Sequence, residues 1–161
     1  MFSNCSSTPV EQEQTQKYFF DIDGYFKQQA SSLNRTPVIK TVSKNKVAET
    51  KTIVVENWEQ ELQLFMECDI NKPAWKDSYR RDSSSNILTY TATDPELRVR
   101  NIKIDFRGQL PQKIEINTKS KNLLYHTTEK LIFIPDSIYE ITKHQKVLLL
   151  GLNDYEISGR F

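Results

Sequence analysis

Cysteine, histidine and glycine are scarce in this chain, and their scarcity limits the chemistry that can be expected of it. The 161 residues include two cysteines, two histidines and four glycines. His126 and His144 lie on different expected strands, with no cysteine or carboxylate at metal-ligand spacing around either. The glycines stand alone and suit turns, and no G-x-S-x-G nucleophile motif occurs. The sequence therefore predicts no metal, no cofactor and no catalytic residue.

Net charge and long apolar runs are also lacking. Lysine and arginine number 22 against 21 aspartates and glutamates, and the two signs are interspersed. This balance predicts neither nucleic-acid binding nor a polybasic membrane patch. The longest apolar candidate is KVLLLGL near the C-terminus, well short of the roughly 18 residues that a membrane-spanning helix needs. Only four residues precede Cys5, so we expect that any secretory signal that stood there has been lost.

What is present divides into a polar N-terminal segment and a body with regular apolar periods. Residues 1–16 are mostly Ser, Thr, Gln and Glu, which predicts a flexible tether, and residues 17–161 predict a single domain. Apolar residues at helical spacing predict an amphipathic helix over about 16–33. The run TPVIKTVSKNKVAETKTIVV then predicts a hairpin that turns at SKNK. A second helix is predicted in ENWEQELQLFMECDI, with Asn57 and Gln60 as a capping box.

After a polar loop at RRDSSSN, the pattern predicts only strands. Short alternating runs are separated by the turn signals DPE, RGQLP, KSK, PDS and LND. Successive hairpins favour an antiparallel meander, and the two helices must cover it, so the fold class is α+β. We expect the sheet to curl or to divide into two layers. The expected buried side of the sheet consists of Ile102, Ile104, Phe106, Ile114 and Ile116.

Several stretches resemble a family of small uncharacterised lipoproteins of the Bacteroidota cell envelope. The stretches, in chain order, are WEQELQLF, DINKPAW, YTATDPELRVRNIKI, KIEINTKSKNLLY, YEITKHQKVLLLG and YEISGRF. The similarity covers about residues 18–161, and DINKPAW is its most distinctive part. The resemblance implies a secreted protein anchored in the outer membrane through a lipid on Cys5 and facing the periplasm. It supplies no enzymatic activity and no cofactor.

Cys5 has three interpretations. Acyl chains on Cys5 would hold the membrane while the polar tether lets the domain stand clear of it. A tail cysteine without a role is the second interpretation. The third is a disulfide with Cys68, the other cysteine of the chain. Cys68 lies near Met66 and Ile70, where a small buried apolar residue is expected.

The stretch DINKPAWKDSYRR is the best candidate for a functional surface, because it combines aromatic and arginine side chains that protein interfaces favour. The candidate interface residues are Trp75, Lys76, Tyr79, Arg80 and Arg81. The alternative is that Trp75 only closes the core between the second helix and the sheet.

Three functions are consistent with these patterns. The first is a non-catalytic envelope lipoprotein that contacts another envelope protein or serves as an accessory subunit. The second is a carrier of an apolar ligand, which requires an unfilled groove under the sheet. The third is a hydrolase, which requires His126 or His144 to meet a carboxylate or hydroxyl in a cleft.

Overall fold

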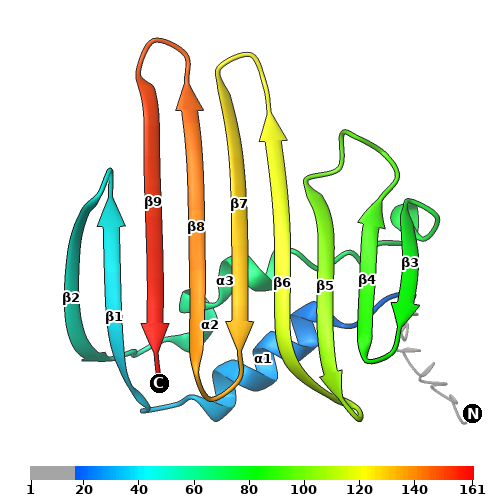
Figure 1. The fold of residues 1–161 in the computed structure, drawn as a ribbon, viewed down its shortest axis with the longest axis horizontal. Helices are drawn as coiled ribbons and strands as arrows, with labels where there is room; N and C mark the ends of the chain where they lie inside the picture. Colours follow the sequence, from blue (N-terminus) through cyan, green and yellow to red (C-terminus); the bar gives the residue numbers. More distant parts are fainter. Residues whose placement is uncertain (1–16) are drawn as a thin grey trace, which may run out of the picture.

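An open antiparallel sheet with helices on one face forms the body of the protein in a computed structural model that describes residues 17–161 (Figure 1). Its nine strands are β1 (Pro37–Lys44), β2 (Val47–Val54), β3 (Tyr79–Ser84), β4 (Ile87–Ala92), β5 (Val99–Arg107), β6 (Leu110–Lys121), β7 (Tyr125–Ile134), β8 (Ile138–Val147) and β9 (Gly151–Arg160). Their order across the sheet is β2-β1-β9-β8-β7-β6-β5-β4-β3. The sheet does not close, and β2 and β3 form its two edges. The predicted α+β class and antiparallel meander are confirmed.

The sheet is assembled from two parts of the chain. Strands β3 to β9 follow one another as hairpins, as the turn signals indicate. The hairpin of β1 and β2 then joins the far side of the last strand, with Lys44 opposite Tyr155 and Ile39 opposite Arg160. This pairing places the first hairpin of the domain beside its last strand.

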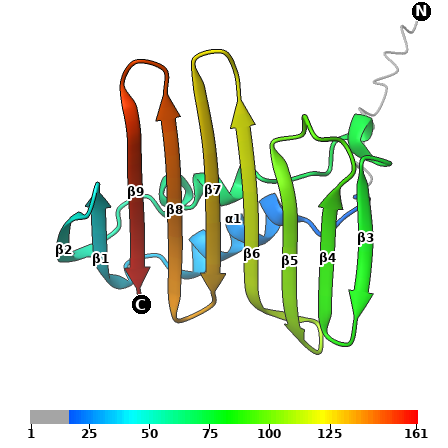
Figure 2. The ribbon, with the colours of Figure 1, turned by 45° about the horizontal axis from the view of Figure 1, so that its top comes forward.

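The helices are α1 (Ile22–Ser32), α2 (Trp58–Glu61), α3 (Gln63–Met66) and the short 3₁₀ turn η1 (Pro73–Trp75). Figure 2 shows that α1 crosses behind the strands on one face of the sheet. The Asp21 side chain caps α1 by accepting from the N–H of Gly24, and Asn57 caps α2 by accepting from that of Gln60. The expected second helix is interrupted at Leu62, where the backbone leaves the helical region and starts α3.

The core lies between the sheet and these helices. Ile102, Ile104, Ile114 and Ile116 are fully buried, and Phe106 packs against them, so the predicted buried side is confirmed. An aromatic cluster fills the centre of the core. The centre of the Phe26 ring lies 4.7 Å from that of Phe65 and 5.1 Å from that of Phe133. The opposite face of the sheet carries the polar side chains of the alternation, including the ion-paired residues Lys113, Glu115 and Lys130.

Three local predictions about the strands were wrong. The supposed loop RRDSSSN is largely strand β3, which pairs with β4 along its whole length. The supposed turn KSK lies inside β6, and the supposed turn LND lies inside β9. The turns are at 122–124, directly after KSK, and at 148–150, shortly before LND. The expected N-terminal helix also begins at Ile22 instead of residue 16.

Candidate functional site

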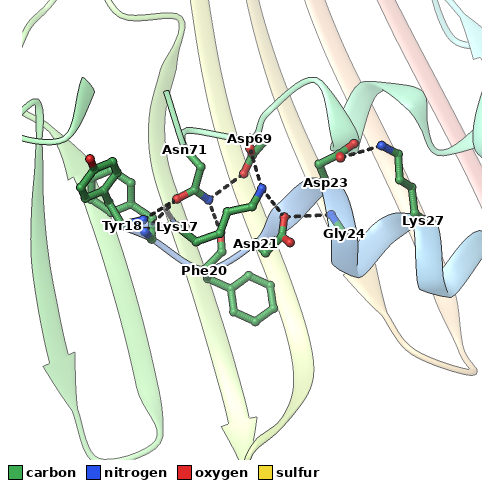
Figure 3. A network of polar contacts seen from close by, with 10 residues as sticks. Lys17, Tyr18, Phe20, Asp21, Asp23, Gly24, Lys27, Asp69 and Asn71 are labelled. Atoms are coloured by element: carbon green, nitrogen blue, oxygen red, sulfur yellow. Dashed lines mark hydrogen bonds and ion pairs between the residues drawn. The ribbon is translucent and has the colours of Figure 1, made fainter. Parts of the chain in front are cut away.

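Asn71, in the distinctive DINKPAW stretch, holds the first described residues of the chain against the domain (Figure 3). Its Oδ1 accepts hydrogen bonds of 2.9 Å from the backbone N–H groups of both Tyr18 and Phe19. Its Nδ2 donates to the carbonyl of Phe20 at 3.1 Å and to Asp69 Oδ1 at 3.0 Å. The Asn71 amide thus uses its two N–H donors and its carbonyl acceptor at the same time, a combination that Asn and Gln side chains provide. We call this arrangement the Asn71 clamp.

A charged network extends the clamp to helix α1 (Figure 3). Lys17 Nζ lies 3.0 Å from Asp21 Oδ1 and 3.9 Å from Asp69 Oδ2. The hydrogen bond to Asp21 raises the pKa of Lys17 above its ordinary value. Burial works to raise the pKa of Asp21, but the Gly24 N–H and the Lys17 ammonium outweigh it, so that pKa lies below its usual range. Both groups are therefore charged at neutral pH, and the network ties residue 17 to the helix.

The clamp also explains why the helix starts late. The backbone N–H of Phe20 donates to the Tyr90 hydroxyl at 3.0 Å, after Tyr18 and Phe19 have bonded to Asn71. These partners come from distant parts of the chain and hold residues 18–20 out of the helix. Periodicity alone could not reveal them, because helical spacing continues through Tyr18 in the sequence.

Trp75 and Tyr79 are placed differently from each other. Trp75, in η1, is half-buried against the core, and Lys72 Nζ lies 4.3 Å from the centre of its ring. Tyr79 is 6% exposed, and its hydroxyl donates to the Val99 carbonyl at 3.1 Å. Burial raises the pKa of Tyr79 to about 12. Tyr79 is therefore part of the core and offers no side-chain surface to a partner.

Lys76, Arg80 and Arg81 are exposed, but they do not form one patch. Arg80 and Arg81 are neighbours in β3, so their side chains project to opposite faces of the sheet. Arg80 Nε lies 3.2 Å from Asp82 Oδ2. Arg81 instead lines a depression of about 420 Å³ whose apolar residues include Phe20, Leu88 and Phe106. We call this the Arg81 depression, and it adjoins the clamp through Phe20.

A second cavity lies between the first hairpin and the helices α2 and α3, and no local pattern in the sequence predicts it. It has a volume of about 660 Å³, and its lining includes Ile53, Leu64 and Ile157. At its edge, Lys40 Nζ lies 2.6 Å from Glu61 Oε1, which also accepts from the Tyr139 hydroxyl. The pair joins the hairpin to α2. Burial and the neighbouring carboxylate raise the pKa of Tyr139 well above its ordinary value.

The two histidines lie on the open face of the sheet, on neighbouring strands β7 and β8. His144 Nδ1 lies 2.7 Å from Asp154 Oδ1, and both side chains are more than half exposed. His126 Nε2 is buried without a hydrogen-bond partner in the described part of the chain. Neither histidine lines the two cavities described above. Within residues 17–161, no group of three or more His, Cys, Asp or Glu side chains could hold a metal ion.

Cys68 is fully buried at the end of the α3 region, as expected for a small apolar residue. Its Sγ donates to the Leu64 carbonyl at 3.2 Å, and burial raises the pKa of its thiol to about 12. Cys5 and the predicted tether, residues 1–16, lie outside the described residues.

Comparisons with known proteins add no relative. The chain matches no family model, no curated protein and no solved structure. Among residues 17–161, none of the helices has the length and apolar content needed to cross a membrane.

Proposed function

We propose that this protein is a non-catalytic lipoprotein of the cell envelope, anchored to the outer membrane through Cys5 and facing the periplasm. Its domain acts as an accessory subunit that contacts another envelope protein. The resemblance of residues 18–161 to envelope lipoproteins motivates the proposal. The observation that carries it is the Asn71 clamp, because it secures the domain at the point where the polar segment with Cys5 joins it.

The clamp suits a tethered domain for a mechanical reason. A pull on an N-terminal segment acts first on the residues where that segment enters the fold. Here residues 17–20 are bonded to Asp69 and Asn71 in one segment and to Tyr90 in another. Several bonds that must break together resist such a pull better than the frayed end that a domain terminus usually has.

The Arg81 depression supports the protein-contact part of the proposal. It combines an exposed arginine with the aromatic rings of Phe20 and Phe106, and aromatic and arginine side chains are enriched in protein interfaces. Of the residues singled out in the sequence, Arg81, Lys76 and the half-buried Trp75 remain candidates for the contact. Arg80 is engaged with Asp82 on the other face of the sheet.

The cavity beside Lys40 and Glu61 supports a second candidate function, the binding of a mainly apolar ligand. Its lining combines apolar side chains with one ammonium group and three carboxylates, and the ammonium group of Lys40 pairs with Glu61. A ligand with a polar end could therefore lie with that end at the ion pair.

Lipidation is tested by producing the chain behind a lipoprotein signal in a bacterial host and separating membranes from soluble protein. We expect the mature protein to begin at Cys5, to carry acyl chains by mass spectrometry and to sediment with membranes. Cys5→Ser should release a folded domain into the soluble fraction. The matched control Cys68→Ala should stay on the membrane. A Cys5→Ser protein that remains membrane-bound would refute the anchor.

Partner binding is tested by affinity isolation from native membranes after chemical cross-linking. Arg81→Glu reverses the charge at the depression, and Arg160→Glu, at an exposed position on β9, is the matched control. We expect one protein partner to be lost with Arg81→Glu and kept with Arg160→Glu. Equal recovery with both variants would exclude the Arg81 depression as the contact surface.

A further inference from the structure

Two hairpin turns at one end of the sheet present a dense group of exposed leucines. The turns, at residues 122–124 and 148–150, lie side by side at the top of Figure 1, and the N–H of Leu148 donates to the carbonyl of Leu124 at 2.8 Å. We call this region the leucine end. Its leucines, all at least 61% exposed, are Leu123, Leu124, Leu148, Leu149, Leu150 and Leu152. The exposed fractions of Leu123 and Leu149 are 95% and 96%.

Within residues 17–161 nothing covers these leucines, and the helices lie beneath the other end of the long strands (Figure 1). The turn itself is well bonded. Asn122 Oδ1 accepts from the N–H groups of Leu124 and Tyr125, at 2.8 Å and 2.9 Å. The leucines are therefore held outward on ordered turns. Exposed apolar groups gathered in this way mark an interaction site.

The backbone at Leu149 adds a second, independent observation. Leu149 has φ of 70°, the left-handed conformation that side chains with a Cβ adopt at an energetic penalty. Glycine would relieve this strain, yet the chain places a leucine there and exposes it almost completely. Strain retained at an exposed apolar position points to a role for the side chain.

The charges around the leucine end are of one sign. Residues 117–128 and 141–153 contain four lysines and two histidines but no aspartate or glutamate, in a chain whose total charge is nearly balanced. Strand pairing sets Lys121, His126 and Lys146 opposite one another, and their shared register places them on the same face of the sheet. Two lysine ammonium groups, with His126 between them in the register, thus lie directly behind the turns.

Neighbouring elements leave this charge positive. Lys143 pairs with the buried Glu129, at 3.5 Å. Glu96, from the β4–β5 connection, lines a depression with Lys119 and Lys121, and Arg98 in the same depression pairs with Glu129 at 3.1 Å. His144 pairs with Asp154 one row further from the turns. Lys121 and Lys146 have no ion-pair partner among the described residues.

We propose that the leucine end inserts into the surface of a bilayer containing anionic lipids, with its lysines against the headgroups. The composition favours lipid over protein: leucine and lysine are under-represented at protein contact sites, where tryptophan, tyrosine and arginine dominate. Apolar side chains in the acyl boundary and lysines at an anionic surface are the two contributions that hold peripheral proteins on membranes. The inference does not depend on acylation of Cys5. If both hold, the domain has two membrane attachments.

The test uses the full chain with Cys5→Ser, so that no acyl chain contributes. It is sedimented with vesicles of phosphatidylcholine alone or of equimolar phosphatidylcholine and phosphatidylglycerol. We expect binding to the mixed vesicles to be at least about tenfold stronger, because two or more lysines meet the anionic surface. Added salt should weaken binding to the mixed vesicles, because it screens the attraction between the lysines and the anionic headgroups.

Leu149→Gly separates membrane binding from folding. It removes a leucine from the tip but relieves the left-handed strain, so it should be at least as stable to heat as the parent chain. Together with Leu123→Gln, it should reduce vesicle binding by about tenfold or more. Leu110→Gln is the matched control, since Leu110 is 68% exposed at the β5–β6 turn, at the opposite end of the sheet. That variant should bind like the parent chain.

A tryptophan reporter locates the contact. Leu149→Trp should show a blue-shifted emission on adding the mixed vesicles, and Leu110→Trp should not. The proposal is overturned if the parent chain does not bind the mixed vesicles, or if the leucine-end variants bind as well as Leu110→Gln. It is also overturned if the leucine end joins two copies of the chain. In that case sedimentation would show a dimer of the parent chain that does not bind vesicles, and Leu149→Gly with Leu123→Gln would convert this dimer to a monomer.

Discussion

The ring of Tyr139 on β8 lies against the backbone of Gly159 on β9, directly opposite it in the sheet. A Cβ placed on Gly159 would overlap the ring, so the glycine provides the space that the buried tyrosine occupies. In this space the Tyr139 hydroxyl donates to Glu61, and the centre of the Tyr139 ring lies 6.2 Å from that of Trp58. One glycine thus supports the junction between the sheet and α2.

Gly159→Ala should therefore destabilise the domain by about 1–3 kcal/mol or more, as overpacking of a core does. Urea unfolding measures the loss. In a Tyr139→Leu background, where the smaller side chain leaves room, the same alanine should be much less destabilising. Equal losses in both backgrounds would show that the Tyr139 ring does not require the glycine.

Asn71→Ala tests the clamp. It removes four hydrogen bonds and leaves two backbone N–H groups without their partner, so a loss of about 1–3 kcal/mol is expected. Amide hydrogen exchange at Tyr18 and Phe19 should accelerate with it. Asn122→Ala is the matched control, because Asn122 makes the same kind of bond to two N–H groups in an exposed turn. Asn122→Ala should lower the free energy of unfolding by less than about 1 kcal/mol. A larger loss for Asn122→Ala than for Asn71→Ala would refute the clamp.

The sheet was predictable where alternation and burial coincide. Ile102, Ile104, Ile114 and Ile116 alternate with charged residues, and each lies in the core. Strand β3 was missed because, as an edge strand, it exposes nearly every side chain and has no period. The pairing of β1 with β9 had no local signal either, since it joins segments more than a hundred residues apart.

The candidate sites depend on the same long-range pairing. DINKPAW was recognisable as a distinctive stretch, but the role of Asn71 depends on Tyr18 and Phe19, more than fifty residues earlier. KVLLLGL was visible as the longest apolar run. Its meeting with Leu123 and Leu124 follows only from the β7–β8 register, which no single segment specifies.

Cys68 should be protected from thiol reagents in the native state. Its side chain is fully buried and burial raises its thiol pKa to about 12, so both access and the thiolate fraction are small at neutral pH. In a Cys5→Ser chain, labelling should be about a hundredfold or more slower than in denaturant, since it requires opening of the fold. Intact mass of the unreduced parent chain tests the other interpretation, because a Cys5–Cys68 disulfide would make it two hydrogens lighter.

The domain should lose stability steeply in alkali. Burial raises the pKa of Tyr79, Tyr25 and the Cys68 thiol to about 12, and that of Tyr139 further. Above pH 9 to 10 the unfolded chain releases these protons while the folded chain keeps them. The folded state then binds more protons than the unfolded state, so the free energy of unfolding falls as pH rises. Each group contributes a slope of up to about 1.4 kcal/mol per pH unit until its folded pKa is reached.

Tyr79→Phe isolates one of these groups. At neutral pH it should be less stable than the parent by about 0.5–1.5 kcal/mol, because the hydrogen bond to Val99 is lost. Between about pH 10 and 12 its unfolding free energy should fall less steeply than the parent's, by up to about 1.4 kcal/mol per pH unit, since one buried phenol no longer titrates. Urea unfolding across this range measures both slopes, and the neutral-pH difference serves as the internal control. Parallel pH profiles for the two proteins would mean that Tyr79 already ionises in the folded state as it does in the unfolded chain, and that its burial does not resist the charge.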